Sequence, residues 1–483
     1  MDEITTEQPA VRFEHDLLGE RTVPANAYYG IHTQRAVENF PITGETLSQY
    51  PELIHALADI KQATALANQQ LGLLDTARAE AIAKACALLR QGRLHDQFPI
   101  DVVQGGAGTS TNMNANEVIC NMALELMGRP LGDYDTLHPN EHVNLSQSTN
   151  DVYPTALKLA TYRAGQQLRE QLAALEDSFR VKAAEFRGLL KVGRTQLQDA
   201  VPMTLGQEFG TYAVMLREDQ QRLGEALSLL CEINLGATAI GTGINTHPQY
   251  AGLVRDFLGR VTGLPLITAP DLVEATQDCG VFVHVSGVLK RIAVKLSKIC
   301  NDLRLLSSGP RAGFGEINLP AMQAGSSIMP GKVNPVIPEV VNQVAFEVMG
   351  NDVTIACAAE AGQLQLNAFE PMIAYAMFRS LSHLTQACRV LDEKCVRGIT
   401  ANPERLREQL DHSIVLVTAL NPYIGYENAT QVAKEALASG RAIRQIVTER
   451  GLLTSEQLNS ILNVETLTTP RAPVAHVAQA AAH

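Results

Sequence analysis

The chain has 483 residues, of which 46% are hydrophobic, and 39 Lys and Arg against 51 Asp and Glu give a formal net charge of −12. No basic tract interrupts this acidity, which argues against a nucleic acid or an anionic membrane as partner. The start is acidic and polar, no run of about 18 uncharged apolar residues occurs, and the eight cysteines form no CxxC pair, so we expect a soluble cytoplasmic protein with reduced thiols.

Three stretches repeat apolar residues in steps of three and four, the spacing of one helix face. They span residues 168–190, 209–230 and 285–306. Each is longer than about 20 residues, which is long for a helix of a globular protein. Strand-like alternation is scarce, and a chain with 5% aromatic residues and no Trp is a poor candidate for an all-β fold. The sequence therefore predicts an all-α fold whose long helices bury their apolar faces in a bundle, within one chain or between subunits.

Four polar segments separate the predicted helices. In chain order they are 105–112, 146–151, 193–196 and 307–335, all rich in Gly, Ser, Thr or Asn, which disfavour a helix interior. Backbone N–H groups and small hydroxyls beside glycine can converge on carboxylate or phosphate oxygens. Capping and turn chemistry explains any one of these segments better than ligand binding does. Four of them in one chain, one carrying a lysine, indicate an anion-binding site.

Three segments partly match familiar motifs but lack residues or a conformation that those motifs require. Residues 325–332 resemble a P-loop, yet five residues instead of four separate the glycines, and Val333 replaces the magnesium-binding Ser or Thr. Residues 106–111 lack the third glycine of a dinucleotide fingerprint. Residues 138–142 fit the H-x-x-E-H zinc pattern, but their proline and asparagine favour a turn over the helix that this pattern needs. We therefore expect no cofactor and no metal site.

The fourth segment carries a longer signature. Residues 325–335 read GSSIMPGKVNP, which resembles the signature of the fumarase/aspartase superfamily, whose members eliminate across the C–C bond of succinyl compounds to release fumarate. The match extends to DLLGE at 16–20, YYGIHT at 28–33 and NPYIGY at 421–426. The resemblance implies an N-terminal helical domain (1–146), a central domain of long helices (147–401) and a small C-terminal helical domain (402–483), with the central bundles of four subunits packed into one core.

One side chain indicates the leaving group. Members that eliminate water typically place a histidine after the Gly-Arg-Thr turn, where it works with a glutamate. Here that position is Gln196, and the glutamate counterpart is Glu339. An amide cannot act as a general base, and residues 362–367 and 28–33 also resemble members that eliminate ammonia. The resemblance therefore implies reversible deamination of L-aspartate to fumarate, with a class II fumarate hydratase as the alternative.

The resemblance also assigns roles residue by residue. It implies that Ser326 removes the C3 proton, on a loop that closes over the substrate, where a nest of backbone N–H groups, helped by Lys332, must activate the hydroxyl. The charge that develops on the β-carboxylate needs preorganised donors. The expected substrate-binding residues are Thr109, Ser148, Thr149 and Ser327 at the β-carboxylate, Lys332 and Asn334 at the α-carboxylate, and Asn150, Thr195 and Gln196 at the amino group.

The expected assembly is a homotetramer in which each active site takes loops from three subunits, and the expected ligands are L-aspartate and fumarate, with no nucleic acid and no membrane. Two other interpretations stay open: a non-catalytic scaffold of this fold, and a lyase for a larger succinyl-substituted amine. The segment that holds His138 and His142 has no assigned role. The tail from Thr468 on lacks a periodic face and is predicted to be disordered.

Overall fold

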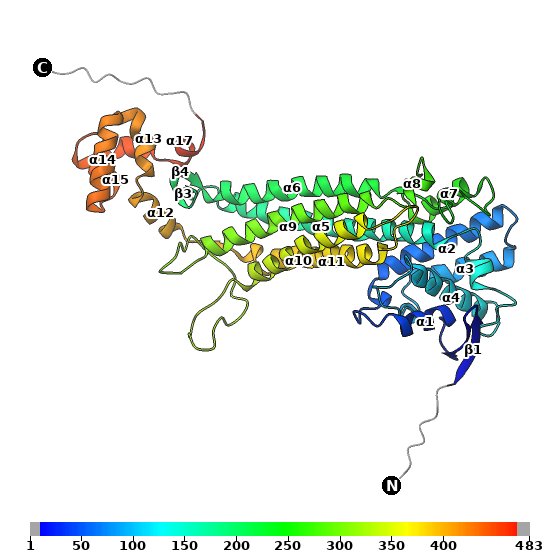
Figure 1. Cartoon of the computed structure of the whole chain (residues 1–483). Coiled ribbons are helices and arrows are strands. Elements are labelled where there is room, and N and C mark those ends of the chain that lie inside the picture. Colours follow the sequence, from blue (N-terminus) through cyan, green and yellow to red (C-terminus); the bar gives the residue numbers. More distant parts are fainter. Residues whose placement is uncertain (1–9, 471–483) are drawn as a thin grey trace, which may run out of the picture. The chain divides into compact units, whose positions relative to one another are not determined.

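The computed structural model describes residues 10–470, and the chain divides into two compact units. Unit 1 runs to Arg169 and includes Gln221–Ala293 and Phe346–Thr385, while unit 2 contains Glu170–Gln220, Val294–Ala345 and the chain from Gln386 on. Helices make up most of the described chain, and the all-α prediction is confirmed (Figure 1). The predicted domain boundaries at 146/147 and 401/402 are a different partition of the chain and stay a prediction.

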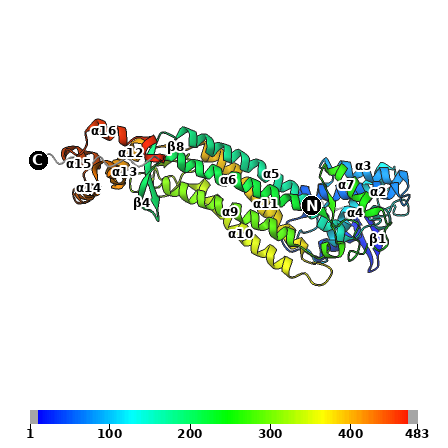
Figure 2. The same ribbon diagram turned by 90° about the horizontal axis from the view of Figure 1, so that it is seen from above.

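The long helices of the described chain are α5 (Thr149–Glu185), α6 (Leu205–Leu229), α9 (Gly280–Leu306), α10 (Val336–Glu360) and α11 (Glu370–Lys394). The apolar stretch predicted at 285–306 falls in α9, and the one at 209–230 passes the end of α6 by one residue. The stretch at 168–190 lies in α5 only as far as Glu185, and its last residue, Leu190, begins β3 (Leu190–Thr195). Helix α5 begins at Thr149, well before its predicted stretch. Residues 151–161 are buried on every side, so this part of the helix shows no apolar periodicity in the sequence. In each unit, segments of these helices lie side by side (Figure 2).

Unit 1 is built on α2 (Pro51–Gln70), α3 (Thr76–Arg90) and α4 (Thr109–Leu126), which pack on one another. Around them lie the hairpin β1 (Val11–Asp16) and β2 (Gly19–Pro24), helices α1 (Ile31–Asn39), α7 (Tyr250–Thr262) and α8 (Leu272–Ala275), the parallel pair β5 (Glu232–Ile233) and β6 (Ile267–Thr268), and the single turns η1 (Leu47–Gln49), η2 (His95–Gln97) and η3 (Pro139–Val143). Helix α2 begins with a proline at its first position, where the fixed φ favours helix. It then buries most of its residues, including Asp59 and Lys61.

Unit 2 combines an antiparallel hairpin, β3 (Leu190–Thr195) and β4 (Gln198–Thr204), with the C-terminal helices. These are α12 (Pro403–His412), α13 (Val415–Ile424), α14 (Tyr426–Ser439), α15 (Ile443–Glu449), α16 (Ser455–Ile461) and α17 (Val464–Thr468); η4 (Val396–Gly398) and the pair β7 (Ile317–Asn318) and β8 (Thr400–Ala401) precede them. Leu416, Leu420 and Ile446 are buried in the core of these C-terminal helices. Directly after the end of α5, Phe186 packs edge-on against Phe209 of α6, with ring centroids 5.1 Å apart.

Two polar segments predicted to lie outside helix interiors end in the first turn of a helix. Thr109 begins α4 and Thr149 begins α5, so residues 109–112 and 149–151 are helical. Thr468 ends α17, and the predicted disordered tail beyond residue 470 lies outside the described residues. None of the helices within residues 10–470 is long and apolar enough to span a membrane.

Candidate active site

The ten predicted site residues fall into two groups. The first, here called the threonine cluster, lies in unit 1 and comprises Thr109, Ser148, Thr149 and Asn150. The second lies in unit 2: Ser326, Ser327, Lys332 and Asn334 share the segment 325–334, here called the serine loop. Thr195 ends β3, and Gln196 stands in the turn between β3 and β4. Each group is described within its own unit.

Two helices begin in the threonine cluster. Thr109 follows a glycine-rich turn in which Gly108 has φ +83°, and a Cβ atom at Gly108 would lie 2.3 Å from the ring of Tyr153. Only glycine therefore fits before α4. The free N–H groups and partial positive charge at helix N-termini favour anions, and Thr109 and Thr149 add hydroxyl donors there. The local structure thus suits a carboxylate ligand.

Asn150 is oriented by a neighbouring loop. Its Nδ2 donates to the carbonyl oxygen of Ala239 at 2.6 Å, which leaves its Oδ1 free to accept a hydrogen bond, as a substrate ammonium group requires. The fully buried Asp151 holds that loop, because its carboxylate accepts the backbone N–H groups of Gly236 (3.1 Å) and Thr238 (3.0 Å). Burial raises the pKa of Asp151 to about 6, against these hydrogen bonds. The sequence pattern gives no specific role to Asp151 within the polar segment 146–151.

A buried lysine, also missed from the sequence, lies behind the threonine cluster. Lys61 is 0% exposed, and its Nζ donates to three amide oxygens: Asn112 Oδ1 at 2.7 Å, Gln147 Oε1 at 2.8 Å and Asn144 Oδ1 at 3.0 Å. Burial lowers the pKa of Lys61 to about 7, and the nearby Asp151 carboxylate opposes this effect. In the sequence Lys61 stands near other polar residues such as Asp59 and Gln62, so no sequence signal marks it as buried.

The serine loop is closed at its base. Gly325 donates its N–H to the carbonyl oxygen of Lys332 at 2.9 Å, and Asn334 Nδ2 donates to the carbonyl oxygen of Gly325 at 2.8 Å. A Cβ atom at Gly325 would lie 2.3 Å from the Lys332 oxygen, so this close approach requires glycine. These contacts explain the glycine and the asparagine of the signature, and they leave one Nδ2 hydrogen of Asn334 for a carboxylate.

Ser326 has the surroundings expected of an activated hydroxyl. Its Oγ accepts the backbone N–H groups of Ile328 at 3.2 Å and Met329 at 2.9 Å. Two such donors stabilise negative charge on the oxygen, as in other backbone nests. Lys332 is exposed and lines a cleft of about 560 Å³ together with Asn334, Arg304 and Glu339.

The turn that holds Gln196 is strained. Gln196 and Leu197 both have positive φ, +53° and +63°, in a two-residue hairpin turn where Asn-Gly is usual. Such left-handed conformations of ordinary residues cost of the order of 1–3 kcal/mol each and persist where the flanking structure fixes them. Here Arg194 holds the end of β3, because its Nη1 lies 2.5 Å from Oε1 of the fully buried Glu316. The strain therefore lies at a predicted site residue.

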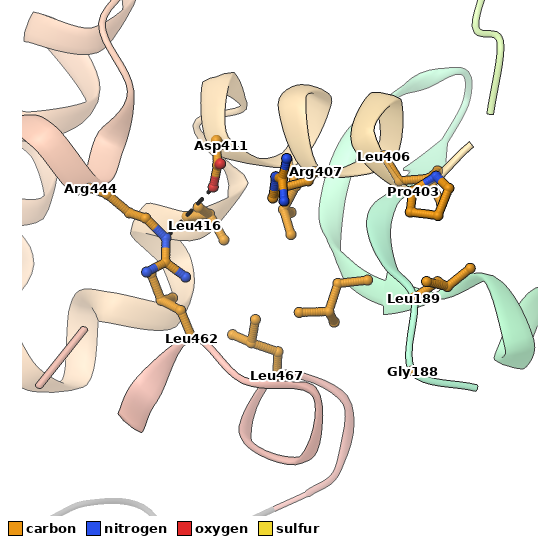
Figure 3. Close-up of a pocket in the computed structure, with 12 residues that line it drawn as sticks. Gly188, Leu189, Pro403, Leu406, Arg407, Asp411, Leu416, Arg444, Leu462 and Leu467 are labelled. Atoms are coloured by element: carbon orange, nitrogen blue, oxygen red, sulfur yellow. Dashed lines mark ion pairs between the residues drawn. The ribbon is translucent and has the colours of Figure 1, made fainter. Parts of the chain in front are cut away.

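Two further regions hold none of the predicted residues. Residues 139–143 form one π-helical turn, in which His142 Nδ1 accepts the N–H of His138 at 2.8 Å. A cavity of about 510 Å³ lies among the C-terminal helices of unit 2, lined mainly by leucines beside Arg407 and an Arg444–Asp411 ion pair (Figure 3). Within residues 10–470, no group of three His, Cys, Asp or Glu side chains is arranged to hold a metal ion.

Comparison with known proteins decides the family. A family model described as Lyase matches residues 19–350, and one described as Fumarase C C-terminus matches residues 416–469. The aspartate ammonia-lyase of Pseudomonas aeruginosa is 60% identical over 461 residues, which are 95% of this chain and 97% of that protein. The chain belongs to the fumarase/aspartase superfamily of lyases.

Solved structures of the superfamily agree with the fold. The fumarate lyase:delta crystallin of Brucella melitensis bound to cobalt is 54% identical with a TM-score of 0.93, over 95% of this chain and all of that one. The class II fumarase of Schistosoma mansoni is 35% identical with a TM-score of 0.87, over 94% and 98% of the two chains. The superfamily predicted from the signature at 325–335 is therefore confirmed.

Proposed function

We propose that the chain catalyses the reversible deamination of L-aspartate to fumarate and ammonia. The observation that carries this proposal is the pair of backbone N–H groups on Ser326 Oγ, because a serine can act as a base only where its oxyanion is stabilised. Relatives named aspartate ammonia-lyase, identical at more than half of the aligned positions, support the choice of substrate. Gln196, an amide where hydratases typically have a histidine, supports ammonia as the leaving group.

In the proposed mechanism, the Ser326 oxyanion takes a proton from C3 of L-aspartate. The electron pair of that C–H bond moves onto the β-carboxylate, which becomes an aci-carboxylate dianion. Hydroxyl donors of Thr109, Ser148, Thr149 and Ser327 hold this carboxylate. Each preorganised donor lowers the barrier by about 2.7–4 kcal/mol, because it binds charge that develops only in the transition state.

The C2–N bond breaks in the second step. The aci-carboxylate electrons return to form the C2=C3 double bond, and the bonding pair of C2–N leaves with nitrogen, so the ammonium group departs as neutral ammonia. Asn150 Oδ1, Thr195 and Gln196 contact the ammonium group, while Lys332 and Asn334 hold the α-carboxylate as a point charge and an amide donor. The proton on Ser326 passes to solvent or ammonia and regenerates the base.

We further propose that the active enzyme is a homotetramer with active sites shared between three copies. Two observations support assembly. The candidate residues are divided between two units, and α10 exposes Phe346 (61%) and Val353 (62%), two turns apart on one side of the helix. Large apolar side chains repeated on an exposed helix face mark an interface. Light scattering of the purified protein should give four times the mass of the chain.

Ultraviolet absorbance of the fumarate double bond tests the activity. The purified protein is given L-aspartate and, separately, L-malate. A rise with L-aspartate alone is the expected result. A rise with L-malate alone would establish a hydratase that works without the usual histidine, and no rise with either would favour the scaffold. A panel of N-substituted aspartates tests whether a larger succinyl-substituted amine is preferred.

A further inference from the structure

Lys61 fixes the direction of three side-chain amides near the threonine cluster. An ammonium group has donors only, so each of Asn112, Asn144 and Gln147 must present its oxygen to Nζ and point its NH₂ group elsewhere. The three acceptors match the three hydrogens of the ammonium group. The orientation of these amides is therefore set by charge, and a flipped amide would face a donor with a donor.

The NH₂ group of Asn112 reaches the predicted site. Its Nδ2 donates to Thr149 Oγ1 at 3.1 Å and also lies 3.1 Å from Asn144 Oδ1. Asn112 is 1% exposed and lies in the first turns of α4, so its position is rigid. Because the Thr149 oxygen accepts this hydrogen bond, its own hydrogen is turned away from Asn112. No acceptor within the described residues takes that hydrogen, so it is available to a ligand.

We propose that Lys61 and Asn112 are positioning residues that polarise the Thr149 hydroxyl as a donor to the substrate β-carboxylate. The inference rests on the proposed function, in which Thr149 stabilises the aci-carboxylate. Lys61 sets the direction of the Asn112 amide, the amide occupies a lone pair of Thr149 Oγ1, and the hydroxyl hydrogen is held ready for charge that develops in the transition state. Neither Lys61 nor Asn112 touches the substrate.

Asn112→Asp tests this relay with almost no change of shape. The carboxylate still accepts from Lys61, but it can no longer donate to Thr149, and the Thr149 hydroxyl turns to donate to it. We expect kcat to fall about 10²–10³-fold, as on loss of one transition-state donor, with little change in KM and in the unfolding midpoint. The kcat of Thr149→Val should fall by a similar factor. The kcat of the double variant Asn112→Asp/Thr149→Val should be no lower than that of Thr149→Val alone.

Asn116→Asp is the matched control. It introduces the same charge one helical turn away, on an amide that contacts Asn144 but not Thr149, and should retain most activity. Equal losses in Asn112→Asp and Asn116→Asp, or a double variant whose loss is the product of the single losses, would overturn the relay. If Asn112→Asp does not fold, Asn112→Ala replaces it in the double-mutant comparison with Thr149→Val. The double variant should then again be no less active than Thr149→Val alone.

The β-carboxylate is common to L-aspartate and L-malate. The double-mutant comparison of Asn112 and Thr149 is therefore run with whichever substrate the wild type converts. An error in the proposed leaving group therefore leaves this test intact. Additive losses with normal wild-type turnover of L-aspartate would remove the relay and keep the proposed function. Wild-type turnover of neither substrate would remove both.

Discussion

The threonine cluster and the serine loop differ in how much of their geometry is fixed before a ligand arrives. The threonine cluster itself is exposed or half-buried, but the Asn112 and Lys61 side chains behind it are essentially inaccessible to solvent and hydrogen-bonded to one another. In the serine loop, Ile328 is 84% exposed and Val333 51%, and backbone hydrogen bonds at the base hold the segment together. One group is supported from behind by a buried hydrogen-bond network, while the other stands on a surface segment.

This difference fits the two tasks of the proposed reaction. Donors that stabilise developing charge act best when they are already oriented, because no reorganisation is then needed during the reaction. A base that must admit substrate and exclude water is better carried on a segment that can close. The exposed apolar side chains of the serine loop, Ile328 and Val333, would be covered on closure. The predictions below separate the two groups.

Ser326→Ala should have the largest effect on turnover. Loss of the base should lower kcat about 10²–10⁴-fold, the range for general base catalysis. The unfolding midpoint should stay at the wild-type value because the side chain is only half-buried, on a surface loop. Fumarate absorbance and thermal unfolding measure the two quantities. Near-normal turnover would remove Ser326 as the base.

A pair of glycine substitutions should separate stability from activity. In the threonine cluster, Gly108→Ala places a methyl group 2.3 Å from the Tyr153 ring, and overpacking of this kind costs about 1–3 kcal/mol of unfolding free energy. In the serine loop, Gly325→Ala places one 2.3 Å from the Lys332 carbonyl oxygen. Separating the two ends of the loop, where Gly325 meets Lys332, should displace Ser326. Turnover should fall roughly a hundredfold, while stability changes little.

Denaturant titration and fumarate absorbance on both variants give the comparison. The contrast between cluster and loop would be lost if Gly325→Ala destabilised the protein as strongly as Gly108→Ala.

A smaller effect is expected on the pH dependence of stability. His142 Nδ1 accepts the N–H of His138, so this contact needs the neutral ring, and burial together with Arg78 lowers the pKa of His142 below 6.5. The stabilisation from the neutral His142 ring is complete above pH 6.5, the pKa of this side chain in the unfolded chain, and is lost as the pH falls through the lowered pKa of the folded protein. His142→Asn keeps an acceptor without titrating. Its unfolding midpoint should therefore fall less than that of the wild type on acidification; parallel curves would contradict the prediction.

The fold was predictable from the sequence where periodicity carried the information. Amphipathic stretches marked α6, α9 and the second half of α5, but the fully buried start of α5 shows no periodic face and was missed. The strained turn at Gln196 and Leu197 has side chains that favour no such turn, so only the structure reveals it.

The candidate residues came from the signature at 325–335 and the matching blocks, because spacing alone could not distinguish ligand binding from capping. Lys61 and Asp151 were missed for a physical reason. A charged side chain in a helix is usually solvated. Only the packing shows that these two are buried, with Lys61 hydrogen-bonded to Asn112 and Asp151 to the backbone N–H of Ser148.

Hybrid tetramers test most directly whether the threonine cluster and the serine loop of different copies work as one active site. Thr149→Val and Ser326→Ala, each nearly inactive, are unfolded, mixed in equal amounts and refolded together. If one copy supplies the cluster and another the loop, about a quarter of the sites combine two intact groups, and fumarate formation should rise to about that fraction of wild type. Refolded mixtures no more active than the separate variants would contradict the shared site.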